Sequence, residues 1–326
     1  LVFLSADNVI NKLQGPARQQ VCTRKNVLDA LRHIDEYWTH RKLDRPTSKT
    51  VSRALEEAGI KESLRARRVG LYELNELIDE ADNFQDWSAT HSETGIHRRI
   101  RVYLTYGKSA EEAETLQKAA KLEFRLLEGI EHPGILRALD YQQHDQGPAL
   151  VFEHDPAAVR LDHFITGLGA DQRLDILDAL SLIRQIAESV RFAHGQRLYH
   201  RVLSPQSIYV VARDDGSFAI KIGNWSTAER LFEAETRHLT VLSHLSCMVQ
   251  EEAGPYLALE AHSLADTDAV YLDIFSLGAI AYLLFAGKPP AENDLELQDK
   301  LSRGTGLQIT DELNGAGQEL QDLVQY

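Results

Sequence analysis

The sequence has 326 residues, 43% of them hydrophobic, which is enough for one two-lobed domain with a small extra segment or for two ordinary domains. Its net charge of -14 repels a phosphate backbone over most of the surface, so nucleic acid is not an expected partner. The two cysteines, Cys22 and Cys247, form no CxxC or Cys/His spacing. This argues against a disulfide framework or a structural zinc site and favours a reducing cytoplasm.

The first 62 residues predict a segment separate from the rest. LVFLS at the start has the character of a strand, and helices are expected over about residues 26–39 and 47–58, the second ending at Gly59. The sequence does not begin with Met and stops just after the amphipathic run GQELQDLVQY. We therefore expect it to be part of a longer polypeptide.

The remaining sequence changes from strands to helices. Short strands surround one helix, expected over about 110–129, and the strand PALVFEH follows. A long helix over about 176–194 comes next, and then two short strands, SIYVV and FAIKI. The apolar run from Ile274 to Ala286 is too short to span a bilayer and predicts a buried core helix, so no membrane partner is expected. Strands with one helix, followed by helices, predict an α+β fold with two lobes.

Five motifs, in the expected order and at plausible spacing, resemble those of protein kinases. HRVLSPQSIYV, from His200, resembles the catalytic loop HRDLxxxN, and KIGNWS occupies the place of the metal-binding DFG. GPYLALEA resembles the APE segment, LDIFSLGAIAYLLFAGKPP the central helix of the large lobe, and LEFRLLEGIEHPGIL the small-lobe helix and its exit. The resemblance implies a small lobe over 63–155 and an incomplete large lobe over 156–326.

A narrower resemblance comes from four segments together: HRVLSPQSI, NWST, EHPGILRALDY and GPALVFEHDPAAVRLDHF. Their combination is similar to the PglW family, the kinase-type proteins of the phage growth limitation and BREX phage-defence systems. In that family a nuclease-related domain usually lies upstream. Residues 1–62 could then hold the tail of such a domain, followed by linker helices.

The resemblance also shows which phosphotransfer residues are replaced. The degenerate positions are Val202 for the proton-accepting Asp, Ser204 for the nearby Lys, Ser207 for the magnesium-binding Asn, and Asn224 for the Asp of DFG. Trp225 is expected to pack against core apolar residues, and Ser226 lacks the freedom of Gly at positive φ. Asn224 gives no charge to a magnesium ion. We expect no intact catalytic residue and no metal site.

The phosphate-covering loop departs furthest from the family. Aligning Phe84 with the aromatic residue of that loop places acids or an amide where three glycines belong, at Glu80, Asp82 and Gln85. With Asp79 and Asp86, up to four negative side chains would lie near a triphosphate. Each pair of like charges at contact range would cost about 1 kcal/mol or more. We expect an exposed acidic hairpin here, and no ATP clamp.

The small-lobe lysine of kinases aligns with either Arg101 or Tyr103. Its expected partner is Glu123. This residue lies on the inward face of its helix together with the apolar Leu116, Ala120 and Leu127. A buried carboxylate needs a partner. An Arg101–Glu123 ion pair would keep the lobe's architecture without the grip on phosphate, and a Tyr103 hydroxyl would do so less well. Both residues therefore belong to a pseudo-site.

Four scaffold residues are retained: His200, Arg201, Glu260 and Asp273. By resemblance, Glu260 occupies the acid position of APE, and Asp273 is expected to brace the backbone of the catalytic loop. His200 is interpreted as a satisfied core histidine and not as a base, because Val202 lies beside it.

The sequence thus predicts a pseudokinase domain of a larger serine/threonine-kinase-like defence protein. It would act as a regulatory or interaction module, with other proteins or domains of the same parent chain as partners and no cofactor. One alternative is an atypical active kinase, using ATP and magnesium, that recruits Asp214 and Asp215; DDGS is an ordinary turn, which disfavours it. The other alternative is a nucleotide sensor without catalysis.

Overall fold

The computed structural model describes residues 67–106, 108–169, 173–230, 251–262, 268–302, 306–310 and 318–325. The strand and the two helices expected within residues 1–58 lie outside these described residues. The chain divides into two compact units, one of Leu1–Glu114 and Gln142–Ala149, the other of Thr115–Tyr141 and Leu150–Tyr326. The predicted domain limits after residues 62 and 155 stay predictions.

The first unit is built on an antiparallel meander, because short turns separate four runs rich in strand-forming residues. Its strands are β1 (Arg68–Val69), β2 (Tyr72–Glu80), β3 (Phe84–His91) and β4 (His97–Tyr103). Three residues join β2 to β3, and Gly95, at φ 71°, lies in the turn before β4. The sheet has the order β1-β2-β3-β4-β6-β5, with β5 at Ala138–His144 and β6 at Gly147–Glu153.

The helical elements lie later in the chain, as the sequence predicts. They are α4 (Ala110–Leu127), α5 (Leu161–Gly167), α6 (Ile176–Gly195), α8 (Ala269–Ala286), α9 (Asp294–Ser302) and α10 (Gln318–Gln325). The helices expected over 110–129 and 176–194 are confirmed within two residues. Asp175 caps α6, since its carboxylate accepts a hydrogen bond from the Leu177 N–H at 2.8 Å. This order of elements confirms a two-lobed α+β fold.

Short strands and 3-10 helices connect the helices of the second unit. They are β7 (Val159–Arg160), β8 (Leu198–Tyr199), η3 (Pro205–Ser207), β9 (Ile208–Ala212), β10 (Phe218–Ile222), η4 (Trp225–Thr227), β11 (Glu229–Arg230), η5 (Glu251–Tyr256) and η6 (Leu259–His262). Strands β9 and β10 form the hairpin predicted from SIYVV and FAIKI. They bracket the DDGS turn and lead directly into the candidate site.

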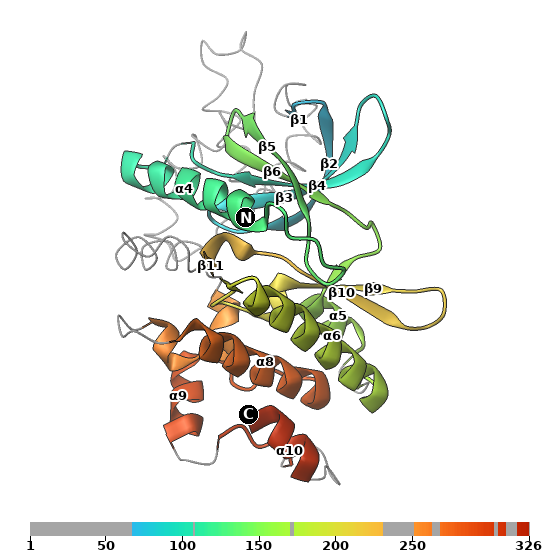
Figure 1. The fold of residues 1–326 in the computed structure, drawn as a ribbon, viewed down its shortest axis with the longest axis vertical. Helices are drawn as coiled ribbons and strands as arrows, with labels where there is room; N and C mark the ends of the chain where they lie inside the picture. The colour runs from blue at the N-terminus through green and yellow to red at the C-terminus, as the bar shows by residue number, and fades with distance from the viewer. Residues whose placement is uncertain are drawn as a thin grey trace, which may run out of the picture. The chain divides into compact units, whose positions relative to one another are not determined.

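Helix α8 forms the centre of the second unit. In Figure 1 it lies between α6 and α10, and it contacts both. The helix begins at Ala269, before the predicted apolar run, and by length and composition alone its 18 residues could cross a membrane. Since 67% of it is buried inside the protein, it has the character of the core helix that the sequence predicts. Gly278 allows the close approach of α10, because a Cβ there would lie 2.7 Å from the carbonyl oxygen of Val324.

The segment after α4 is joined to the strand that precedes the candidate site. Leu136 N–H donates to the Ile222 carbonyl and Ile222 N–H donates to the Gly134 carbonyl, both at 2.8 Å. Gly134 is required at this point, since a Cβ would lie 1.9 Å from Ser189 Oγ on α6. The HPGI motif therefore fixes the end of β10, two residues before Asn224.

Candidate functional site

A buried carboxylate on α8 holds the loop that corresponds to the kinase catalytic loop. Asp273 is 1% exposed; its Oδ2 accepts a hydrogen bond from the His200 N–H at 2.9 Å, and its Oδ1 accepts one from the Arg201 N–H at 2.6 Å. His194 Nε2 on α6 lies 2.8 Å from the same Oδ2. Arg201 has φ 69°, a left-handed conformation that costs a non-glycine residue about 1 kcal/mol or more and needs such support. The two backbone bonds are the bracing role expected of Asp273.

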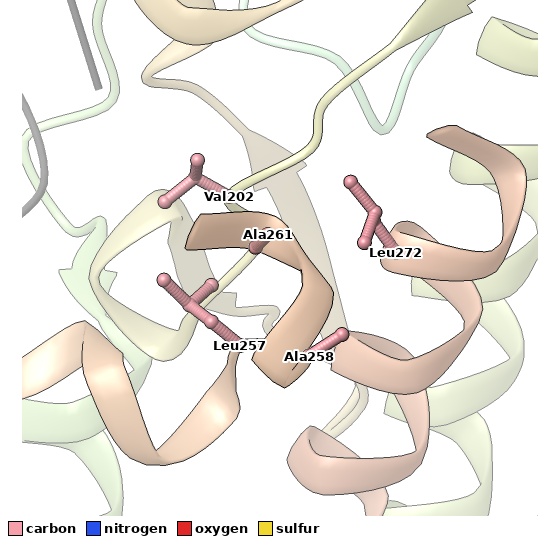
Figure 2. Close-up of a cluster of buried hydrophobic side chains, with 5 residues drawn as sticks. All are labelled: Val202, Leu257, Ala258, Ala261 and Leu272. Atoms are coloured by element: carbon pink, nitrogen blue, oxygen red, sulfur yellow. The ribbon is translucent and has the colours of Figure 1, made fainter. Parts of the chain in front are cut away.

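Beyond this brace, the residue at the proton acceptor's position belongs to the hydrophobic core. Val202 is 7% exposed and packs in a cluster whose other members come from the APE-like segment and α8: Leu257, Ala258, Ala261 and Leu272 (Figure 2). Phe275 covers the cluster from α8. Burying a valine side chain stabilises a protein by about 1.5 to 3 kcal/mol. Position 202 therefore contributes to packing, and its side chain has no group that could accept a proton.

The next two degenerate positions are buried serines. Ser204 and Ser207 are 2% and 3% exposed, and their hydroxyl oxygens lie 3.5 Å apart. Their backbones are also fixed: Ser207 N–H donates to the Ser204 carbonyl at 2.9 Å, and Gly223 N–H donates to the Ser207 carbonyl at 2.8 Å. The loop thus keeps its shape while presenting two small neutral hydroxyls.

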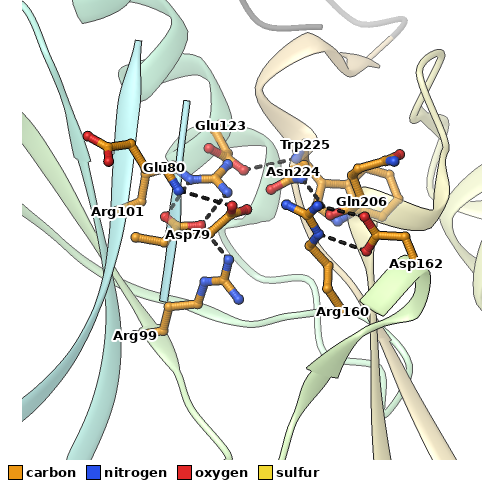
Figure 3. A network of polar contacts seen from close by, with 11 residues as sticks. Asp79, Glu80, Arg99, Arg101, Glu123, Arg160, Asp162, Gln206, Asn224 and Trp225 are labelled. Atoms are coloured by element: carbon orange, nitrogen blue, oxygen red, sulfur yellow. Dashed lines mark hydrogen bonds and ion pairs between the residues drawn. The ribbon is translucent and has the colours of Figure 1, made fainter. Parts of the chain in front are cut away.

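The triplet at the DFG position is held by hydrogen bonds within the second unit (Figure 3). Asn224 Nδ2 donates to the Gln206 carbonyl at 3.1 Å. Trp225 is 1% exposed; its indole N–H donates to the Ile222 carbonyl at 3.0 Å and its backbone N–H donates to Glu123 Oε1 at 2.9 Å. The expected burial of Trp225 is confirmed, and Glu123 faces inward with no exposed surface.

The expected problem of Ser226 at positive φ does not arise. Among the described residues the left-handed conformation of this triplet falls on Asn224, at φ 60°, and Ser226 lies in the 3-10 helix η4. Asparagine adopts that conformation more readily than most residues. Asn224 therefore suits this left-handed backbone and, unlike an aspartate, carries no charge.

His200 is a core residue whose hydrogen bonding is only partly satisfied. It is 1% exposed, and its Nε2 donates to the Gly223 carbonyl at 2.9 Å. Nδ1 makes no hydrogen bond to any described residue. Burial lowers the pKa of His200, which favours the neutral ring. The ring lies 4.7 Å from that of Trp225, so it forms part of the packing around the triplet.

Three further acids named from the sequence, Glu260, Asp214 and Asp215, are exposed. Glu260 lies in η6 and makes no hydrogen bond or ion pair with the residues that the structure describes, so its scaffold role stays a prediction. Asp214 and Asp215 lie in the turn between β9 and β10. Asp215 Oδ1 accepts hydrogen bonds from the backbone N–H and the hydroxyl of Ser217, at 2.9 and 2.6 Å, and these bonds lower its pKa. Both aspartates therefore belong to the turn.

In the first unit an antiparallel hairpin, whose register shifts at two points along β2, stands where the resemblance places a glycine-rich loop. Strand β2 continues to Glu80 and β3 begins at Phe84, so Glu80 pairs with Gln85 in the ladder. Gln85 is 1% exposed, and its Nε2 donates to Glu80 Oε1 at 2.7 Å. Asp82, between the strands, is exposed as predicted. Backbone pairing and the Glu80–Gln85 side-chain hydrogen bond therefore occupy the part of the chain that covers phosphate in kinases.

The expectation of an exposed acidic hairpin is wrong for three of its four acids, because Asp79 and Glu80 are half-buried and Asp86 is buried. The Asp86 carboxylate is completely buried and accepts two hydrogen bonds from Arg101, Nε to Oδ1 and Nη2 to Oδ2, both 2.8 Å long. Arg99 Nη2 also donates to Oδ2. Figure 3 labels the two arginine side chains, Arg99 and Arg101. Burial would raise the pKa of Asp86, but the charges and hydrogen bonds of Arg101 and Arg99 outweigh it and lower the pKa to about 2.

This buried trio of Asp86, Arg99 and Arg101 changes the picture of strand β4. Arg99, Arg101 and Tyr103 occupy alternate positions of this strand and are 5%, 3% and 0% exposed. Asp86 makes this burial possible by pairing with both arginines. The partner seen for Arg101 is thus Asp86, and Glu123 binds the Trp225 N–H; the Arg101–Glu123 ion pair and the Tyr103 alternative stay predictions.

The comparisons with known proteins agree with this geometry. Residues 95–323 match the protein kinase domain family, which is well over half of the chain. The chain therefore belongs to the protein kinase domain family. The match begins after the β2–β3 hairpin, the part that departs furthest from a glycine-rich loop.

Among individual proteins, the chain is 33% identical to the probable kinase PglW of Streptomyces coelicolor over 342 residues, covering 96% of the chain and 22% of that protein. It is 26% identical over 202 residues to calcium/calmodulin-dependent protein kinase type II of Caenorhabditis elegans and of Caenorhabditis briggsae. Those two matches cover 61% of the chain and 25% and 34% of the relatives. The chain thus spans about a fifth to a third of the length of these relatives.

We expect Asp86→Asn to destabilise the protein by about 3 to 5 kcal/mol at neutral pH, because two buried arginines lose their countercharge. The folded pKa of Asp86 is lowered from 3.8 to about 2, so its stabilising effect is present above pH 4 and is lost as the pH falls through 2. Urea unfolding of both proteins from pH 7 to pH 2 should show the difference narrowing below pH 4. Asp82→Asn, in the exposed turn, is the control, and a difference that stays constant with pH would contradict the account.

We expect Val202→Asp, which recreates the catalytic acid in the sequence, to destabilise the fold by about 3 kcal/mol or more and to produce no phosphotransfer. The new carboxylate would lie unpaired in the apolar cluster of Figure 2. Val202→Thr, of similar size and uncharged, should cost about 1 to 3 kcal/mol. Thermal unfolding measures both, and a Val202→Asp protein that is as stable as the parent would show that the position is not part of the core.

Proposed function

We propose that this chain is a pseudokinase domain that acts as a regulatory or protein-interaction module within a larger, serine/threonine-kinase-like bacterial phage-defence protein. The observation that supports this most strongly is the place of Val202 in a hydrophobic cluster with the APE-like segment and α8. A catalytic loop can lose its acid by a single substitution. Here the replacement is also part of the packing between three segments, so the loop contributes to the core.

The groups that would bind a nucleotide and its metal support the same reading. Phosphoryl transfer depends on cations and metal ions that neutralise the phosphates. In this chain Arg101 is paired with the buried Asp86, and Asn224 donates its amide N–H to a backbone carbonyl. Within the described residues no group of three or more His, Cys, Asp or Glu side chains could hold a metal ion. ATP and magnesium are therefore not proposed as cofactors.

The retained scaffold argues for a function that needs the fold. The Asp273 brace, the Glu123 hydrogen bond and the junction of Gly134 with Ile222 all persist although the catalytic groups do not. Maintaining a buried carboxylate with three hydrogen-bonding neighbours requires exact placement, since a buried charge is costly when a partner is lost. A surface for another protein, or for another domain of the same parent chain, would use this rigidity.

The similarity to PglW supports the proposed setting. It extends over 96% of the chain but only 22% of a protein whose name describes a probable kinase. Since the match leaves most of that relative's length uncovered, a kinase activity of such a protein can belong to another region. We propose that this segment contributes regulation to a parent of that type, in the cytoplasm.

Phosphotransfer and nucleotide binding can be tested together on the purified protein. One arm measures transfer from labelled ATP with magnesium or manganese, with Ser207→Ala/Asn224→Ala as the matched control that lacks the remaining oxygen ligands. The other arm measures Tm with ATP or ADP at millimolar concentration, with and without magnesium. We expect equal background transfer in both proteins and Tm shifts below about 1 °C.

The other outcomes identify the alternatives. Transfer that is lost in the double variant would establish an atypical active kinase and overturn the proposal. A Tm shift without transfer would instead make the chain a nucleotide sensor. Replacing Asp214 and Asp215 with Asn should change neither readout, since both belong to the β9–β10 turn.

A further inference from the structure

The buried trio of the first unit has the composition of an anion site with its ligand already in place. Arg101 offers two parallel N–H groups to the two oxygens of Asp86, at 2.8 Å each, and Arg99 adds a third donor to one of them. This is the bidentate arrangement by which arginine binds carboxylate and phosphate ligands. The anion here happens to be a side chain of the same chain.

We propose that Arg99 and Arg101 form a preorganised oxyanion site, that Asp86 occupies it as a permanent internal ligand, and that the site accepts a small free carboxylate such as formate once the Asp86 carboxylate is removed. This deepens the proposed function, because it identifies the residue that excludes external oxyanions from the first unit. Asp86 would then determine what the site binds.

Local structure positions both cations before any ligand arrives. Asp86 lies directly opposite Arg101 in the β3–β4 ladder, and Arg99 is two residues earlier on β4, so all three side chains share one face of the sheet. The Arg101 guanidinium carbon lies 4.1 Å from the centroid of the Phe84 ring, a cation–π contact that also helps to position it. The ladder and this contact do not depend on the Asp86 carboxylate.

Burial gives the site both its strength and its selectivity. Arg99 and Arg101 are 5% and 3% exposed, so water screens their charges poorly and an anion between them is strongly favoured. Truncating Asp86 to Ala removes one carboxylate and leaves space for a ligand of about that size beside two like charges. Formate supplies the missing atoms and charge, whereas chloride cannot make the bidentate contacts.

The test measures Tm for the purified protein and for Asp86→Ala in sodium formate against sodium chloride at equal ionic strength. The control is Asp86→Ala/Arg99→Met/Arg101→Met, which replaces the trio with side chains that need no anion. We expect formate at tens of millimolar to raise the Tm of Asp86→Ala by about 3 °C or more and to leave the other two proteins unchanged.

If Asp86→Ala does not fold in chloride, its refolding yield, followed by circular dichroism, replaces Tm, and recovery in formate but not in chloride is the expected result. No formate effect in either measurement, or an equal effect in the triple variant, would overturn the anion site. That failure would leave the proposed loss of phosphotransfer standing, because Val202 and Asn224 are unchanged. Phosphotransfer by the unmodified protein would overturn the proposed function and leave the anion site untouched.

Discussion

The second unit depends on one buried carboxylate. Asp273 is placed by the central helix α8 and fixes two successive backbone N–H groups, those of His200 and Arg201, on the loop opposite. These bonds hold Arg201 in its left-handed conformation, and the turn of the chain at that residue sets where Val202 lies. The hydrophobic cluster around Val202, the buried serines and the hydrogen bond from Gly223 to Ser207 all follow from this loop geometry. The Asp273 hydrogen bonds, which in kinases support the catalytic loop, here position a loop whose Val202 packs in the hydrophobic core.

Positions that the kinase resemblance assigns to phosphate binding make internal contacts in the first unit as well. Kinases need a cation for phosphate and flexible glycines above it, and in this chain the cation at position 101 is bound by Asp86 while the glycine positions belong to a strand ladder. These positions make contacts within the protein. Such internal contacts suit the proposed module, which would present a fixed surface to a partner.

The sequence predicts the elements of this fold well where a periodic pattern extends over many residues. Helices α4 and α6 and the hairpin of β9 and β10 are found within two residues of their expected limits, because local hydrophobic periodicity determines them. The degenerate positions also follow from the motif. The burial of Val202 does not, because its neighbours come from residues 257–261 and 272, and a single sequence gives no measure of such distant contacts.

The pairing of Asp86 with Arg99 and Arg101 is partly indicated by the sequence. Arg99 and Arg101 are two residues apart in the sequence, and in a strand that spacing places both side chains on one face. The turn containing Gly95 sets the register that brings Asp86 opposite Arg101. Assigning Asp86 to an exposed loop hid this pairing, because a flexible phosphate loop has no register. Likewise, the positive φ expected to trouble Ser226 falls on Asn224, which only the backbone conformation reveals.

A crystal structure of the protein grown with millimolar ATP and magnesium is the most direct test that the catalytic groups have become structural. The account predicts that Val202 stays packed against Leu257 and Ala261, and that Asn224 and Ser207 carry neither nucleotide nor metal. A nucleotide with a divalent ion bound by Asn224 and Ser207 would contradict it.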